Sequence, residues 1–448
     1  MTEKNYTLPI LATILLCIIA ISEYVTTPHP KPGPVEITYW EKWTNFEGDA
    51  IRAVVDEFNR TQDKIHVNLL SISGIENKTL MAVAGGNPPD VAGLYDRNVA
   101  QYADANAIQN IDAYCQKGGI REEQYVKPYW ELGYYKNHVY ALPSVPASTA
   151  LHYNRELLEK AGYDPDKPPK TIEEMTELAD RLVQKSPDGR IKVAGFLPAE
   201  PGWWNWSWGQ HFGGKLWDGK DKITANSAEN IRAFEWIQSF SKKYGINDLQ
   251  TFRSGFGTFA SPQNAFLSEK VVMEQQGVWM YNFISQYSPK MKWSASAFPY
   301  PKDRPDLANS TIVEADILAI PRGAKHPNEA FEFIKYVQSQ KGMELLCMGQ
   351  RKHSPLKTVS AEFIKNHPNP YIRLFQELPA GKNNYSTPRL GIWPEYMAEL
   401  NTAFDNIILM KMTPQEALDK VQKRMQPKLD QYLKILRLRE ANEKGATP

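Results

Sequence analysis

Residues 35–72 decide the fold and read VEITYWEKWTNFEGDAIRAVVDEFNRTQDKIHVNLLSI. Apolar and polar side chains alternate in residues 35–40, which is typical of a β-strand. In residues 50–59 the apolar side chains instead recur every three or four positions, as in a helix. Residues 65–72 return to the pattern of a strand. The stretch therefore predicts the beginning of an α/β layer with parallel strands.

The same alternation continues along the chain. Thr171, followed three residues later by Glu174, predicts a capping box at the start of one helix. Helices are predicted over residues 79–84, 171–182, 230–244, 262–268, 328–340 and 413–442. Further strands are predicted over residues 89–94, 150–153, 192–197, 271–273 and 317–320. Together these elements predict a two-lobed α/β protein.

The composition excludes several classes of function. The chain has 448 residues, enough for two or three domains, and its 52 basic and 51 acidic side chains leave a net charge of +1. This balance argues against nucleic-acid binding, which needs a basic surface. The unusual feature is tryptophan, because five of the twelve lie within residues 203–217. That cluster needs an explanation.

The N-terminus carries the features of an export signal. Residues 8–22 are largely apolar, too few to span a bilayer as a helix but suited to a signal peptide that is cleaved after Ser22. With residues 23–25 added, an uncleaved anchor is the alternative. Residues 28–34 contain four prolines and predict an extended tether. We therefore expect a periplasmic or other extracytoplasmic location, either free or anchored to the cytoplasmic membrane by residues 8–25.

No catalytic or cofactor motif is evident in the sequence. The eight histidines are scattered without metal-ligand spacing, and no nucleophile elbow or nucleotide-binding loop occurs. Cys115 and Cys347 are expected to be two separate buried thiols. We therefore predict no cofactor and no metal, and the prediction of no enzyme activity rests on the ordered motifs described next. A glycan-degrading enzyme is the alternative, because Glu200 and a second carboxylate beside tryptophans would also suit a glycosidase.

Seven motifs in order carry a resemblance to a known family. They are GGNPPDV (85–91), VYALP (139–143), LHYNRELL (151–158), GYD (162–164), PPKT (168–171), FLSEKVVM with GVW (266–279), and ILAIPRGA (317–324). Together they resemble the extracellular solute-binding proteins of bacterial ABC importers, in the sugar-binding family that includes maltose-binding protein. Two positions depart from the family pattern, where Glu269 replaces a glycine and Val272 replaces a small residue.

The resemblance implies a two-lobed periplasmic-binding-protein-like fold of type II, with the ligand bound in a cleft by hinge closure. It divides the chain into residues 1–35, the signal peptide or anchor with its tether; lobe 1 over 36–146 and 310–354; and lobe 2 over 147–309 and 355–442. It also implies a monomer that captures a carbohydrate, of which an oligosaccharide is the expected form, and docks on permease subunits. Nucleic acid is not an expected partner.

A sugar site needs aromatic faces for the C–H side of the rings and carboxylates or amides for the hydroxyls. The segment EPGWWNWSW (200–208) supplies both kinds of group. The resemblance places this loop, the GVW step and the segment after residue 94 on the cleft. The predicted ligand-binding residues are Trp40, Trp43, Tyr95, Asp96, Ser148, Glu200, Trp203, Trp204, Trp279, Glu314 and Trp393.

Two other solutes on the same fold are left open. Glycerol phosphate would need a converging basic pair, for which Arg97 and Arg389 are the candidates. A polyamine would need several acids around aromatic rings, which this sequence also offers. Ala147 stands where the maltose-type pattern has an acid, so maltose itself is not the expected ligand.

Overall fold

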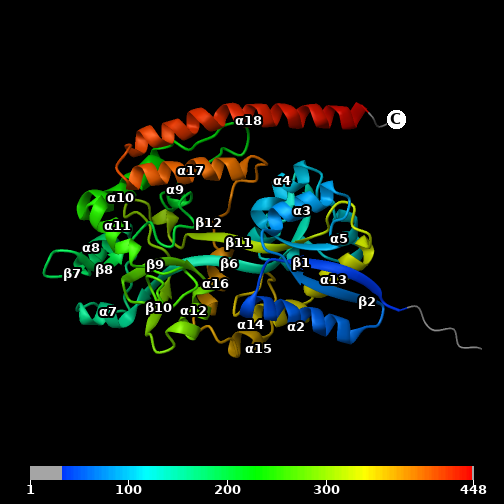
Figure 1. Cartoon of the computed structure of the whole chain (residues 1–448), viewed down its shortest axis with the longest axis horizontal. Helices are drawn as coiled ribbons and strands as arrows, with labels where there is room; N and C mark the ends of the chain where they lie inside the picture. Colours follow the sequence, from blue (N-terminus) through cyan, green and yellow to red (C-terminus); the bar gives the residue numbers. More distant parts are fainter. Residues whose placement is uncertain (1–32, 446–448) are drawn as a thin grey trace, which may run out of the picture.

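The computed structural model describes residues 33–445. The predicted signal or anchor, residues 8–25, lies outside them. Within residues 33–445, no helix combines the length and the apolar character that a membrane crossing requires. The fold consists of two lobes that share one curved, mixed sheet, with strand order β2-β1-β3-β11-β6-β9-β8-β7 (Figure 1).

Lobe 1 is built on the predicted parallel strands. β1 (Val35–Glu41) pairs in parallel with β2 (Ile65–Ser71) and β3 (Val91–Tyr95), and β11 (Thr311–Ala319) is antiparallel to β3. The apolar face of helix α2 (Asn45–Thr61) packs on this sheet with Val54 and Phe58 buried. The other helices of lobe 1 are α3 (Ile75–Ala84), α4 (Val99–Asp104), α5 (Asp112–Gly118), α6 (Lys127–Leu132), α13 (Pro327–Val337) and α14 (Gln340–Gly349).

One continuous strand, β6 (Ala141–Asn154), joins the lobes. Its first part pairs with β11, and from Thr149 onward it pairs with β9 (Val271–Gly277). At this change of partner, the Thr311 hydroxyl donates to the Thr149 carbonyl oxygen at 2.9 Å. The sequence predicted only residues 150–153 as strand, because Pro143 and Pro146 interrupt the strand pattern. The predicted lobe boundaries remain predictions.

Lobe 2 surrounds the other end of β6. β8 (Ile191–Phe196) is parallel to β9, while β7 (Gln184–Lys185) and β10 (Trp293–Ser296) pair with β8 and β6. The predicted capping box of Thr171 and Glu174 is confirmed at the start of α8. The helices around this sheet are α7 (Arg155–Lys160), α8 (Ile172–Arg181), α9 (Trp208–His211), α10 (Ala228–Tyr244), α11 (Ile246–Ser254), α12 (Met280–Tyr287), α16 (Ile372–Glu377) and α17 (Trp393–Ile408). The short helix α15 (Ala361–Lys365) instead packs on the core of lobe 1 through Phe363.

The predicted helix over residues 262–268 is wrong, because this stretch forms successive turns. The Asn264 side-chain oxygen accepts hydrogen bonds from the backbone N–H groups of Phe266 and Leu267, at 2.9 and 3.2 Å. Such a local bond competes with helix formation. The following Glu269 has a φ of 59°, a left-handed conformation that favours the glycine of the resembled family.

The last helix, α18 (Pro414–Gly445), spans both lobes (Figure 1). Its first part packs in the core of lobe 2, and its second part extends over lobe 1. There the Tyr432 hydroxyl lies 2.7 Å from the Tyr135 hydroxyl and bonds the Asp104 carboxylate, and Arg439 donates to the Asp104 carbonyl oxygen at 2.6 Å. Lys136 also bonds the carboxylate, at 2.9 Å. We call these five residues the Asp104 clasp.

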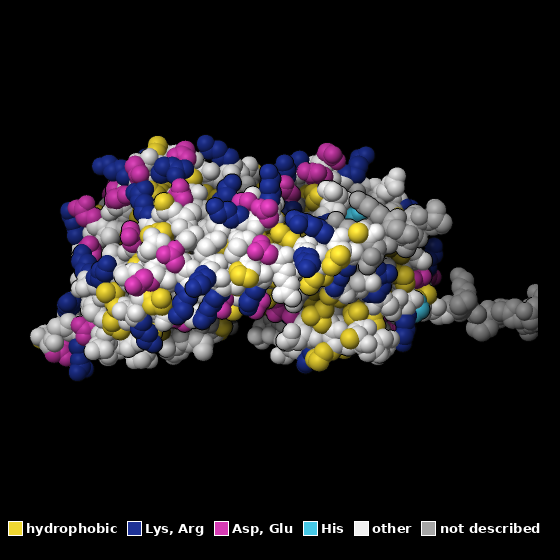
Figure 2. Space-filling model, turned by 90° about the horizontal axis from the view of Figure 1, so that it is seen from above, with side chains coloured by type: hydrophobic (Ala, Val, Ile, Leu, Met, Phe, Trp, Pro, Cys, Tyr) yellow, Lys and Arg dark blue, Asp and Glu magenta, His cyan; other side chains and the backbone are white. Residues whose placement is uncertain are grey.

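The face of the molecule that carries α18 has no region of a single charge sign. Figure 2 shows Lys and Arg side chains interspersed with Asp and Glu over both lobes. This mixture agrees with the net charge of +1.

Candidate functional site

Three predicted tryptophans form one cluster on lobe 2. The loop after β8 carries Trp203 and Trp204, and Trp279 lies between β9 and α12. The Trp279 ring centroid is 6.0 Å from that of Trp203 and 5.7 Å from that of Trp204. Trp203 is 44% exposed, whereas Trp204 is buried. Phe259, which the sequence did not suggest, extends the cluster with its ring 4.3 Å from Trp203. The loop thus presents an exposed indole that packs against other aromatic rings.

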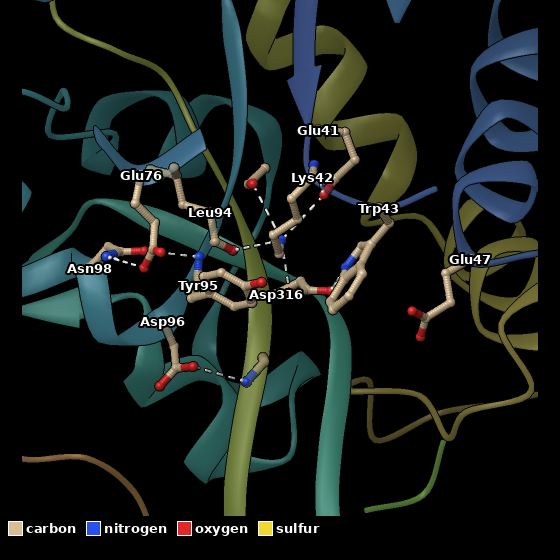
Figure 3. Close-up of polar contacts among 12 residues, drawn as sticks. Glu41, Lys42, Trp43, Glu47, Glu76, Leu94, Tyr95, Asp96, Asn98 and Asp316 are labelled. Atoms are coloured by element: carbon tan, nitrogen blue, oxygen red, sulfur yellow. Dashed lines mark hydrogen bonds and ion pairs between the residues drawn. The ribbon is translucent and has the colours of Figure 1, made fainter. Parts of the chain in front are cut away.

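In lobe 1, several predicted site residues surround Lys42, whose side chain is almost fully buried (Figure 3). The Lys42 ammonium lies 3.0 Å from Asp316 Oδ1 and 4.6 Å from the centre of the Tyr95 ring. Glu41 Oε1 is a further partner at 3.2 Å. Burial alone would lower the pKa of Lys42, but Asp316 and Glu41 raise it above its ordinary value. The Trp43 indole donates to Asp316 Oδ2 at 2.5 Å. Trp43 and Tyr95 are therefore held around a neutralised ammonium.

Two predicted carboxyl groups, Asp96 and Glu314, lie where the lobes meet. Trp204 Nε1 donates to Glu314 Oε2 at 3.1 Å, and the Ala315 backbone N–H donates to Asp96 Oδ1 at 3.3 Å. Neither carboxyl forms an ion pair within residues 33–445. Burial and then the nearby Glu314 raise the pKa of Asp96 to about 7, and burial raises the pKa of Glu314 as well. Both groups are thus poised to form hydrogen bonds with a neutral solute.

The remaining basic groups of this region are already paired. Arg97 stacks on Tyr95, with its guanidinium carbon 3.9 Å from the ring centre, and forms an ion pair with Glu76 at 3.2 Å. Arg389 pairs with Glu131 at 3.3 Å. The charge of Arg97 also acts on Asp96 and Glu314 and partly offsets the rise in the pKa of each, so these two carboxyls lack an ion-pair contact but have a base nearby.

A second buried lysine, Lys352, lies between the aromatic groups of the two lobes. Its ammonium pairs with Glu47 Oε1 at 2.7 Å and lies 5.6 Å from the Trp43 ring centre and 5.8 Å from that of Trp279. The sequence did not point to Lys42 or Lys352, because a lone lysine usually indicates a solvated surface. The adjacency of Lys42 to Trp43 was the only signal available.

Four predicted residues lie apart from this cluster. Trp40 packs against a core of lobe 1, and the Ser148 hydroxyl is buried and donates to the Phe375 carbonyl oxygen at 3.0 Å. The Glu200 carboxylate accepts from Arg253 at 2.7 Å. Trp393 is fully buried in the core of lobe 2, edge-on to Trp206. We leave Ser148 and Trp393 out of the proposed site, because their side chains are enclosed by protein.

Comparisons with known proteins agree with this architecture. Residues 45–344 match the model of the family described as bacterial extracellular solute-binding protein. The chain is 21% identical over 408 residues to the sn-glycerol-3-phosphate-binding periplasmic protein UgpB of Pectobacterium atrosepticum, covering 86% of this chain and 89% of that protein. It is 22% identical to UgpB of Escherichia coli O6:K15:H31, with 94% and 96% covered.

Solved structures give the same architecture. CpMnBP1 with mannotriose bound superposes with a TM-score of 0.75 at 26% identity, covering 87% of this chain and 99% of that one. The substrate-binding protein Lmo0181 of Listeria monocytogenes, in complex with cycloalternan, gives a TM-score of 0.75 at 18% identity, covering 89% and 99%. These similarities establish the two-lobed fold.

Proposed function

Because this chain belongs to the family of bacterial extracellular solute-binding proteins, we propose that it captures an oligosaccharide between its lobes and delivers it to an ABC permease. The members and neighbours named above are binding proteins. The mechanism we propose is therefore capture: the lobes close around the solute, and the closed complex docks on the permease.

The observation that carries the proposal is the combination of aromatic faces and unpaired carboxyls where the lobes meet. Trp43 comes from lobe 1, while Trp203 and Trp279 come from lobe 2. Indole faces suit the C–H side of a sugar ring. Asp96 and Glu314 supply oxygens that accept hydrogen bonds from hydroxyl groups. CpMnBP1, with mannotriose bound, makes a manno-oligosaccharide the first probe to use.

Glycerol phosphate is the second candidate, because the UgpB proteins are relatives along most of the chain. A phosphate binds where basic groups converge without acidic partners. Here Lys42, Arg97 and Lys352 each already pair with a carboxylate. In their ionised form Asp96 and Glu314 would also repel a dianion, so the electrostatics favour a neutral solute. A polyamine would need both carboxyls ionised, which their raised pKa values disfavour, and spermidine is the comparison that tests this.

The proposal includes an extracytoplasmic location. Residues 1–35 would act as an export signal or as a membrane anchor with a proline-rich spacer, and the folded body would act as a monomer. Membrane fractionation before and after high-salt washing separates the two cases, because only an anchored chain stays in the membrane fraction.

The test is a comparison of solutes by thermal unfolding and calorimetry. Mannotriose at 100 times its Kd is expected to stabilise the protein by about 2.7 kcal/mol. We expect sn-glycerol 3-phosphate and spermidine to leave the unfolding temperature unchanged. Chromatography of the recovered mannotriose should show no cleavage. Stabilisation by glycerol phosphate alone or by spermidine alone, or turnover of the sugar, would refute the proposal.

Substitutions test the stacking surface. Trp203→Ala and Trp279→Ala should each weaken mannotriose binding, because each removes an aromatic face. Trp217→Ala is the matched control, since the Trp217 indole donates to the Lys220 carbonyl oxygen away from the cluster. Equal affinities for all three variants would contradict the assignment.

A further inference from the structure

We propose that Lys352 is a ligand-binding residue, whose ammonium donates hydrogen bonds to the solute between the Trp43 and Trp279 faces. The inference rests on the proposed function and names a polar contact within that site.

The position of Lys352 is the first argument. Lys352 follows α14, and 3% of the residue is exposed. Its ammonium lies 5.6 Å from the Trp43 ring centre and 5.8 Å from the Trp279 ring centre, and these rings belong to opposite lobes. Lys42 also lies near two rings, but Trp43 and Tyr95 are both in lobe 1. Among residues 33–445, Lys352 is thus the cation that faces the stacking surfaces of both lobes.

The unused hydrogen-bonding capacity of the ammonium is the second argument. An ammonium has three N–H donors. The contact with Glu47 Oε1 at 2.7 Å is its one polar contact among the described residues, and Figure 3 shows Glu47 near the Trp43 indole. At least two N–H groups are therefore buried without a protein acceptor. Buried donors without acceptors are costly, and a solute oxygen between the rings would satisfy them.

The chemistry of a sugar fits this donor. A sugar ring that stacks on an indole presents its hydroxyls at the edge of the ring. A sugar that enters between Trp43 and Trp279 would bring hydroxyl oxygens close to a donor placed between them. Because Glu47 neutralises Lys352, the pair would attract a neutral oxygen without creating a site for an anion.

The experiment measures Kd by calorimetry with mannobiose and mannotriose on the complete folded protein. Lys352→Met keeps the length of the side chain but removes the donors and the charge, and Lys352→Arg keeps both. The matched control is Lys341→Met, because Lys341 forms an exposed ion pair with Glu57. We expect Lys352→Met to raise Kd by about 10- to 100-fold, Lys352→Arg to recover part of the loss, and the control to match the wild type.

Each outcome separates the inference from the proposed function. If Lys352 only supports the fold, Lys352→Met lowers the unfolding temperature without sugar but leaves Kd unchanged, and the inference is overturned. If the wild type binds no oligosaccharide, the proposed function fails and the inference fails with it. Lys352→Gln, with an amide donor of shorter reach, is the second variant if Lys352→Met does not fold. Unchanged Kd in that variant also overturns the inference.

Discussion

Glu274 should make the stability of this protein depend on pH. The residue lies on β9 and is 2% exposed. Its Oε1 accepts a hydrogen bond from Gln276 at 2.7 Å, and within residues 33–445 its Oε2 has no hydrogen-bond partner. Burial is the main reason that the pKa of Glu274 is raised to about 8. Glu274→Gln removes the titrating group and keeps an oxygen that can accept from Gln276.

The sign and size of the effect follow from the two pKa values. Below about pH 4.5, its ordinary value, the Glu274 carboxyl is protonated in both the folded and the unfolded chain. Between pH 4.5 and 8 the unfolded chain loses this proton while the folded chain keeps it, so the free energy of unfolding falls as pH rises. The difference of about 3.5 pKa units, at about 1.36 kcal/mol per unit, corresponds to at most about 5 kcal/mol above pH 8.

The assay is urea unfolding of the wild type and of Glu274→Gln at pH 4, 6 and 8.5. The stability of the variant relative to the wild type should increase by several kcal/mol between the lowest and the highest pH, up to the limit of about 5 kcal/mol. Glu235→Gln serves as the control, because Glu235 is exposed on α10. Parallel pH profiles for the wild type and Glu274→Gln would refute the reasoning, since Glu274 would then ionise equally in both states.

Three further predictions follow from the fold. Tyr432→Phe removes one hydroxyl from the Asp104 clasp; it should lower the free energy of unfolding by about 1 kcal/mol, and urea titrations that show no change would exclude the effect. Trp206→Ala should lower the free energy of unfolding by about 3–5 kcal/mol in urea titrations, because Trp206 is 2% exposed in the lobe 2 core; a loss below 1 kcal/mol would contradict this packing. Cys115 and Cys347 are both free and buried, and burial raises the pKa of Cys115 to about 12; iodoacetamide should label neither thiol until the protein is unfolded, and mass spectrometry that finds native labelling would disprove it.

The regular elements could be predicted from the sequence where a local signal exists. The strand and helix pattern of residues 35–72 matches β1, α2 and β2 closely, because burial on one face of each element leaves a repeating apolar pattern. The capping box of Thr171 and Glu174 is likewise a local interaction. Where proline interrupts the pattern, as in the first half of β6, the sequence showed too short a strand.

The candidate site was only partly predictable, because many of its residues lie in loops, where apolar residues do not recur at the regular spacing of a helix or strand. Trp203 and Trp206 are three positions apart in one loop, yet 44% of the first and 2% of the second is exposed. The sequence shows both as members of one tryptophan-rich segment, and only the tertiary structure distinguishes the exposed residue from the buried one. The sequence does not indicate a role for Lys42 or Lys352, for a related reason. Their burial depends on carboxylates and rings from segments distant in sequence.

Helix α18 contacts both lobes, and this affects how the affinity for the solute can change during evolution. Because it starts on lobe 2 and ends on lobe 1, any rotation of the lobes must bend the helix or displace its last turns from Asp104. Pro427 lies inside the helix, where it removes one backbone hydrogen bond and makes bending easier. Natural selection could therefore adjust how tightly the solute is held through residues that never touch it. The affinity for the solute and the choice of solute would then be separate inherited traits. The affinity would depend on the Asp104 clasp, and the choice on the aromatic residues of the cleft.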